Sequence, residues 1–149
     1  MCLDIRKTTN PKSMQGIKAT KDGKFLIGYK TVQKGDQTGK LYSRYRGYLW
    51  GRIDRNGELD EASQKLKYSS RETSALTKTE TKRGLIDPGF HFFVHPQAAV
   101  ADCYMDAGMV LTLHVPKDSF IAQGEWDMRK SFVATKAKPV SAKKVNRKK

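Results

Sequence analysis

The feature that most constrains the fold is a turn followed at once by a short aromatic run. Residues 87–89 read Asp-Pro-Gly, and the next four read Phe-His-Phe-Phe. Proline pre-sets its own φ, and glycine accepts the positive φ that a tight turn can require. Because the run is short and aromatic, it favours a buried strand over a helix. Side chains alternate along a strand, so Phe90 and Phe92 are expected on one face and His91 on the other.

A helix is expected directly after this strand, over residues 96–107. Pro96 is tolerated in the first turn, where its missing N–H has no partner to lose. Four alanines in the segment favour a helix. The predicted buried stripe contains residues three and four apart, Val100, Cys103 and Tyr104. Gly108 is placed to end the helix in a left-handed conformation.

Further strands are expected at residues 109–115, 120–122 and 131–138. The sequence therefore predicts an α+β domain, a mostly antiparallel sheet with one main helix packed on it. We expect a single domain over residues 1–138, with a long and mobile middle loop at about residues 58–84 and a basic tail at residues 139–149. The middle loop offers few side chains to a core: Leu66, Tyr68, Ala75 and Leu76.

The order of these short motifs resembles a group of small, mostly uncharacterised bacteriophage proteins. In that group a Gly-Phe-His strand precedes a short helix, and a strand with Ala-Ser/Thr-Lys lies near the C-terminus. The matching residues here are 89–91 and 134–136, and the opening Met-Cys-Leu and residues 28–30 are also similar. The resemblance implies a phage origin, and hence the host cytoplasm or the virion as location, more than it implies an activity. The long basic tail and the long middle insertion depart from the group.

Positive charge is strong and unevenly placed along the chain. The formal net charge is +14. Residues 1–57 carry thirteen basic and four acidic side chains, and residues 128–149 carry nine basic and none acidic. Residues 86–127 between them carry one basic and six acidic side chains. This asymmetry predicts a mildly acidic body flanked by two basic regions that meet a polyanion.

The strand expected at residues 41–53 interleaves aromatic rings with arginines. Single-stranded nucleic acid needs flat faces for base stacking and cations for phosphate. The predicted contact surface is Arg44, Tyr45, Arg46, Trp50 and Arg52. The tail would add sequence-independent, salt-sensitive affinity through Lys143, Lys144, Arg147, Lys148 and Lys149. The competing interpretation is an edge strand whose aromatics pack inward and whose arginines are solvated, with a tail that binds nothing specific.

Residues for catalysis or metal binding are few. The sequence contains neither a phosphate-binding loop motif nor a GxGxxG motif. Metal candidates are limited to His91, His95, His114, Cys103 and Asp102, whose spacing supports no site, so we expect no metal and no cofactor. Cys2 raises the possibility of an N-terminal nucleophile, and a small apolar filler is the alternative.

We therefore expect a non-enzymatic phage accessory protein that binds nucleic acid, or a nucleic-acid-containing host complex, without sequence preference. A second interpretation is a virion component or an inhibitor of a host protein with an acidic surface. A third is a small nucleotide-directed enzyme that uses His91. The longest apolar run is too short to span a bilayer, so we expect no membrane partner. The two cysteines, far apart in the sequence, fit a reducing cytoplasm.

Overall fold

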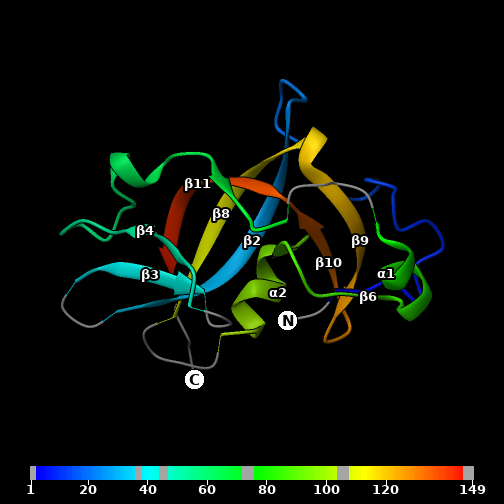
Figure 1. Ribbon diagram of the computed structural model, residues 1–149. Helices are drawn as coiled ribbons and strands as arrows, with labels where there is room; N and C mark the ends of the chain where they lie inside the picture. Colours follow the sequence, from blue (N-terminus) through cyan, green and yellow to red (C-terminus); the bar gives the residue numbers. More distant parts are fainter. Residues whose placement is uncertain (1–2, 36–37, 44–46, 72–75, 104–107, 146–149) are drawn as a thin grey trace.

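The computed structural model describes residues 3–35, 38–43, 47–71, 76–103 and 108–145 of the chain. Within these ranges the chain forms one antiparallel sheet that curls around its own core (Figure 1). Its eleven strands are β1 (Leu3–Asp4), β2 (Phe25–Lys34), β3 (Lys40–Ser43), β4 (Leu49–Arg52), β5 (Lys67–Tyr68), β6 (Leu85–Ile86), β7 (Phe90–Phe93), β8 (Gly108–Pro116), β9 (Phe120–Trp126), β10 (Arg129–Ala134) and β11 (Lys136–Lys144).

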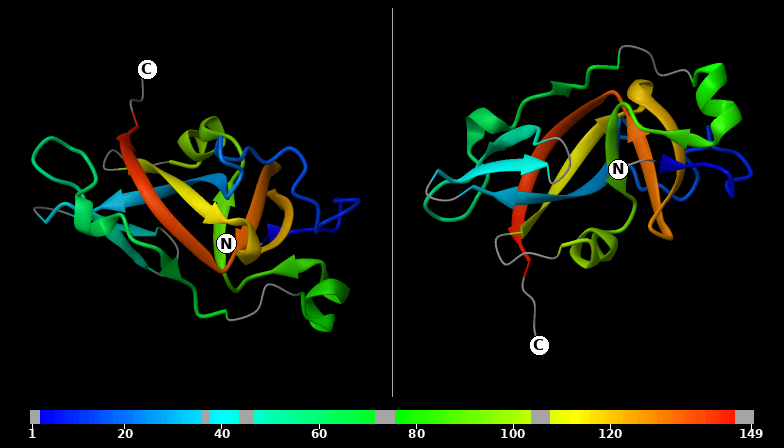
Figure 2. Two further views of the ribbon diagram at one scale, coloured as in Figure 1. Left: turned by 90° about the horizontal axis from the view of Figure 1, so that it is seen from above. Right: turned by 60° about the horizontal axis from the view of Figure 1, so that its bottom comes forward.

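The sheet has a fork at β2. Neighbouring strands follow the order β5-β11-β8-β2-β7-β10-β9-β1-β6. The longest ladder joins β11, β8 and β2, which lie side by side in both views of Figure 2. β3 is off this path and pairs with the end of β2, while β4 pairs with β3. One edge of β2 therefore serves two strands, β7 at Tyr29 and β3 from Val32 onward, and these two strands diverge.

The core lies inside the curl and is built by strand alternation. Every second residue of β8 is buried on the inner face: Met109, Leu111, Leu113 and Val115. Rings from three other strands fill the remaining space: Trp50, Phe90, Phe92 and Phe132. Gly28 of β2 lies against these rings, and a Cβ there would be 2.9 Å from the Cβ of Phe92. Only glycine allows β2 to approach the rings so closely.

The aromatic strand predicted after the Asp-Pro-Gly turn is confirmed as β7. Phe90 and Phe92 belong to one core cluster, as alternation predicts. Phe93 belongs to a separate cluster with the alanines of the following helix. Gly89 has a φ of 109°, the positive value that its place in the turn suggested.

The predicted α+β class with one main helix is wrong, because the sheet is antiparallel but no long helix packs on it among the described residues. The helix after β7, α2 (Pro96–Ala101), has only six residues, and Asp102 is its C-cap. Val100, assigned to the buried stripe, is 43% exposed. Only Ala98 and Ala99 contact apolar surface, and helix propensity without such contacts is a weak determinant. A second six-residue helix, α1 (Lys78–Arg83), and two 3₁₀ turns, η1 (Glu61–Ser63) and η2 (Lys117–Ser119), complete the helical content of the described chain.

The strand predicted at residues 131–138 is two strands joined at a corner. β10 ends at Ala134, and β11 begins at Lys136 and continues to Lys144. The predicted boundary between domain and tail at residue 138 therefore lies inside β11. Pro139 lies within β11, and the register between β11 and β8 shifts between Pro139 and Ser141. Such a bulge accommodates a residue that has no N–H for the ladder.

The segment expected as a long loop contains η1, β5 and α1. β5 pairs with the start of β11, so this part of the segment forms the edge of the sheet. The helix α1 begins at a capping box, in which the Thr77 side chain accepts from the Glu80 N–H and the Glu80 carboxylate accepts from the Thr77 N–H. It ends at Gly84, whose φ is 72°. The helix is thus fixed by local caps, and the strand by pairing with a distant part of the chain.

Candidate nucleic-acid interface and internal pocket

The structure describes four of the ten residues predicted to bind nucleic acid. Six of them lie outside the described residues: Arg44, Tyr45, Arg46, Arg147, Lys148 and Lys149. Arg52 on β4 and Lys143 and Lys144 on β11 are exposed. Trp50 is 0% exposed. The described part of the predicted surface therefore keeps three cations and loses its indole ring.

Trp50 is a core residue and is removed from the candidate interface. Its Nε1–H donates to the Ser43 Oγ at 2.8 Å. Its ring centroid lies 4.7 Å from that of Phe90 and 5.1 Å from that of Tyr48. Alternation along β4 places Leu49 outward, at 47% exposure, and Trp50 inward. A ring enclosed in this way has no face for a base.

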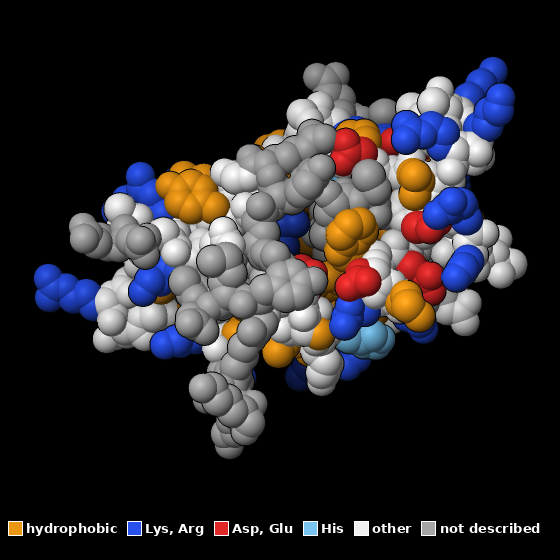
Figure 3. Space-filling view, turned by 90° about the horizontal axis from the view of Figure 1, so that it is seen from below, with side chains coloured by type: hydrophobic (Ala, Val, Ile, Leu, Met, Phe, Trp, Pro, Cys, Tyr) orange, Lys and Arg blue, Asp and Glu red, His pale blue; other side chains and the backbone are white. Residues whose placement is uncertain are grey.

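Exposed cations greatly outnumber exposed carboxylates. Seventeen lysines and arginines of the described chain are exposed, against six aspartates and glutamates. Of the seventeen, only Arg6 belongs to an ion pair that the described residues form, with Asp4. Figure 3 shows Lys and Arg side chains projecting at both ends of the underside, with Asp and Glu side chains gathered to one side of its centre. The positive surface is therefore largely unneutralised.

An exposed aromatic ring lies beside Lys136 at the β5 edge of the sheet, a site that sequence analysis missed. Tyr68 was expected to help form a core but is 62% exposed. The Nζ of Lys136, its partner across the ladder, lies 5.9 Å from the ring centroid. Burial and the nearby charge of Lys65 lower the pKa of Lys67. The sequence shows residues 65–68 as Lys-Leu-Lys-Tyr, but only the pairing of β5 with β11 brings Lys136 to the ring.

A pocket of about 450 Å³ lies at the fork of the sheet. Its described lining comes from both branches: Lys30 and Thr31 of β2, Ser43 of β3, and Phe90, His91 and Phe93 of β7, with Tyr48, Asp87, Pro88, Gly89, Ser69, Ser70, Asp102 and Trp126 around them. The volume falls within the range of small-molecule sites, and the mixture of aromatic walls with a few polar groups is typical of them.

Lys30 links β2 to one branch of the fork, β7. Its ammonium donates to the backbone carbonyl of His91 at 3.0 Å. Burial lowers the pKa of the Lys30 amine to about 8, and the carboxylate of Asp102 partly opposes this shift. Burial destabilises the charged ammonium form, so the pocket contains an amine that is less basic than an exposed lysine.

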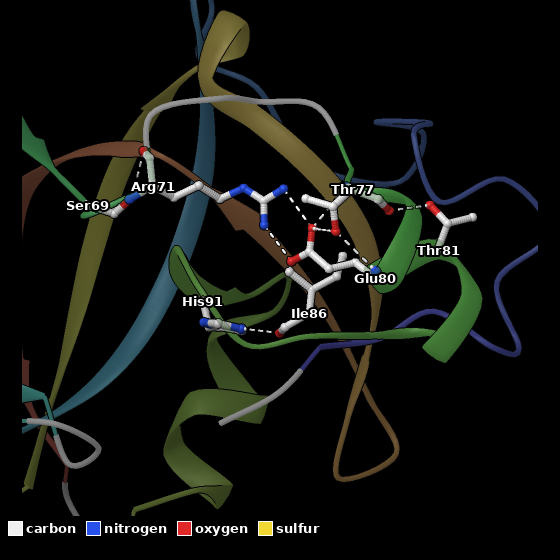
Figure 4. Close-up of polar contacts among 7 residues, drawn as sticks. All are labelled: Ser69, Arg71, Thr77, Glu80, Thr81, Ile86 and His91. Atoms are coloured by element: carbon white, nitrogen blue, oxygen red, sulfur yellow. Dashed lines mark hydrogen bonds and ion pairs between the residues drawn. The ribbon is translucent and has the colours of Figure 1, made fainter.

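His91 has a structural role in this arrangement. The side chain is 5% exposed, and its Nε2 lies 2.9 Å from the Ile86 carbonyl, which requires the tautomer with the proton on Nε2 (Figure 4). Burial lowers the pKa of His91 to about 4; the bond to Ile86 opposes the shift and the charge of Lys30 adds to it. At neutral pH a neutral imidazole therefore joins β7 to β6.

His91 is expected to make the fold acid-sensitive. Its pKa falls from 6.5 to about 4 on folding, so the unfolded chain binds the proton first as the pH drops. This contribution to the free energy of unfolding is fully present above pH 6.5. It falls by about 3 kcal/mol as the pH drops from 6.5 to about 4. His91→Gln keeps an N–H donor but does not titrate. Urea unfolding at pH 7, 5.5 and 4 should show a smaller acid loss in the variant; equal losses would contradict the assignment.

A buried ion pair fixes the chain that passes the pocket. Arg71 follows Ser69 and Ser70, two lining residues, and its guanidinium binds both Glu80 carboxylate oxygens, at 2.5 and 2.8 Å (Figure 4). The hydrogen bond from Arg71 is the main cause of the lowered pKa of Glu80. Glu80 also completes the α1 capping box. One carboxylate thus joins the β5 segment to α1.

The remaining candidates for chemistry do not assemble. His95 is exposed at the start of α2, while His114 on β8 stacks on Phe25 with the ring centroids 5.8 Å apart. Cys103 is buried, and Cys2 lies outside the described residues. Across the described ranges, no three side chains of His, Cys, Asp or Glu form a group able to hold a metal ion.

Comparison of the chain with protein-family models, with curated proteins and with solved structures found no match. The resemblance to small bacteriophage proteins therefore stays a prediction. None of the helices in the described ranges has the length and apolar character needed to cross a bilayer.

Proposed function

We propose that the protein is a non-enzymatic phage accessory protein that binds nucleic acid, free or within a host complex, without sequence preference. The observation that carries this proposal is the surplus of seventeen exposed lysines and arginines over six exposed carboxylates, with only Arg6 in a described ion pair. Cations that are not neutralised within the protein release counterions from phosphate when they bind it. Such binding is salt-sensitive and independent of base sequence.

The β5 edge supports a preference for single strands. Tyr68 offers an exposed ring, the Lys136 ammonium lies over it, and Lys65 and Lys67 are close to it along the chain. Bases of a single strand can stack on such a ring while the backbone follows the lysines, whereas bases of a duplex are already stacked on one another. Arg52, Lys143 and Lys144 are exposed and would contribute further phosphate contacts.

Fluorescence anisotropy with a labelled single strand and a duplex of equal length tests the proposal. We expect affinity to fall linearly with salt on a double-logarithmic plot, and Lys136→Gln to reduce the slope by about 1. Tyr68→Ala should weaken binding of the single strand by about 1–3 kcal/mol and affect the duplex less. The matched control is Leu49→Ala, another exposed apolar side chain on an edge strand, which should change neither.

Weak binding that salt does not alter would refute the proposal. The alternative interpretation, a partner protein with an acidic surface, predicts a different result in infected-cell extract. In that case a host or virion protein would co-purify even after nuclease treatment. Loss of the co-purifying material on nuclease treatment supports nucleic acid as the partner.

A further inference from the structure

Lys30 lies where the strand pattern demands an apolar residue. The register pairs it with Leu111, so it shares the inner face of the sheet with that buried leucine. Its neighbours on the same face of β2 are Gly28 and Val32, both buried. A lysine among such residues carries a large desolvation cost and is rare in folded proteins. The amine does not extend to bulk solvent but donates to a backbone carbonyl beside the pocket.

The hydrogen bond to His91 alone does not require an ammonium group, because a neutral side-chain amide or hydroxyl could satisfy the same carbonyl at lower cost. What a buried amine adds is nucleophilicity. With a pKa of about 8, roughly a tenth of Lys30 is neutral at pH 7, against well under a thousandth of an ordinary surface lysine. The pocket supplies the space for a partner molecule next to it.

We propose that Lys30 is the reactive amine of the fork pocket and forms an imine with an aldehyde or ketone that bears an uncharged aromatic ring. The nitrogen attacks the carbonyl carbon, an N–C bond forms, and the carbonyl oxygen leaves as water with the two hydrogens that the neutral amine gives up. No oxidant or reductant is consumed. Asp102 lines the same pocket and its charge acts on Lys30, so we assign it to carry these protons.

The lining determines the ligand class. Phe90, Phe93 and Trp126 provide aromatic walls that suit a ring. The charged side chains in the described lining are Lys30, Asp87 and Asp102, so carboxylates outnumber ammonium groups there and an anionic ligand is disfavoured. This site is separate from the phosphate-binding surface of the proposed function, and it stands or fails independently of nucleic-acid binding.

Reductive trapping tests the inference on the full chain. Benzaldehyde with sodium cyanoborohydride fixes any imine as a benzylamine, and peptide mass spectrometry locates it. At pH 7 we expect Lys30 to be labelled at least tenfold faster than Lys34, an exposed lysine on the same strand. 4-Carboxybenzaldehyde has the same ring with an added negative charge and should label Lys30 at least tenfold more slowly than benzaldehyde does.

The pH profile and a variant complete the test. Labelling of Lys30 should level off near pH 8. The other titratable groups in the described lining are Asp87, His91, Asp102 and Tyr48. Lys30→Arg leaves these groups in place and removes the amine, so it should lose only the fast-labelled peptide and keep its thermal unfolding. If Lys30 reacts no faster than Lys34, or is protected from the reagent, the inference is overturned.

Discussion

Replacing Trp50 by alanine is expected to cost about 3–5 kcal/mol of unfolding free energy. The indole is fully buried, packs on the rings of Phe90 and Tyr48, and donates to Ser43. Truncation removes these contacts and opens a cavity that the surrounding strands cannot collapse into, since β3, β4 and β7 are all held by their own pairing. Urea unfolding measured by circular dichroism gives the value.

The adjacent residue supplies the control for this prediction. Leu49 is exposed on the same strand, and Leu49→Ala should change stability by no more than about 0.5 kcal/mol. Trp50→Phe retains most of the ring volume, so it should fold and bind nucleic acid with unchanged affinity. If Trp50→Phe folds fully but binds nucleic acid more weakly, the indole must contact the nucleic acid, which would contradict the packing described above.

Breaking the Arg71–Glu80 pair is expected to cost about 3–5 kcal/mol, because removing one partner leaves the other charge largely buried without its ion-pair partner. The Arg71 side chain is buried and that of Glu80 nearly so, and the contact is bidentate. Arg71→Ala should therefore destabilise the chain far more than removal of an exposed pair. The same unfolding assay measures it, with Arg129→Ala as the control, because Arg129 pairs with exposed Asp127.

The double variant separates the pair from its surroundings. Replacing Arg71 and Glu80 together by methionine removes both charges and keeps side-chain volume, so it should recover much of the lost stability. Glu80 also caps α1, and the part that is not recovered measures this second role. A cost for Arg71→Ala below about 1 kcal/mol would place the pair in the class of solvent-screened surface contacts.

Local patterns in the sequence located most of the strands. Two runs of neighbouring residues predicted strands that form: the aromatic run after the Asp-Pro-Gly turn is β7, and the apolar run at residues 109–115 is β8. The uneven distribution of charge is likewise visible in the sequence. The length of α2 could not be predicted in this way. Alanine content favours a helix, but the number of turns that form depends on the apolar surface available, which here extends only under Ala98 and Ala99.

The candidate site was less predictable than the fold. The strand expected at residues 41–53 is two strands, β3 and β4, and the order of Tyr and Arg along the chain does not say which side chains the curl encloses; Trp50 proved to be inside. Tyr68 was expected in the core but is exposed. It lies on an edge strand whose partner, β11, is far away in the sequence, so the neighbouring residues did not reveal its position. The pair of Arg71 and Glu80 likewise depends on how α1 packs.

The sequence by itself determined where most of the strands lie, the turn before β7 and the excess of positive charge, because each of these can be read from the local composition of the chain. Only the tertiary structure decided that Lys30 faces inward at the fork and that Tyr68 faces outward beside Lys136. Strand alternation assigns side chains to two faces. Pairing between distant strands and the curl of the sheet determine which face is buried, and therefore which lysine amine is desolvated.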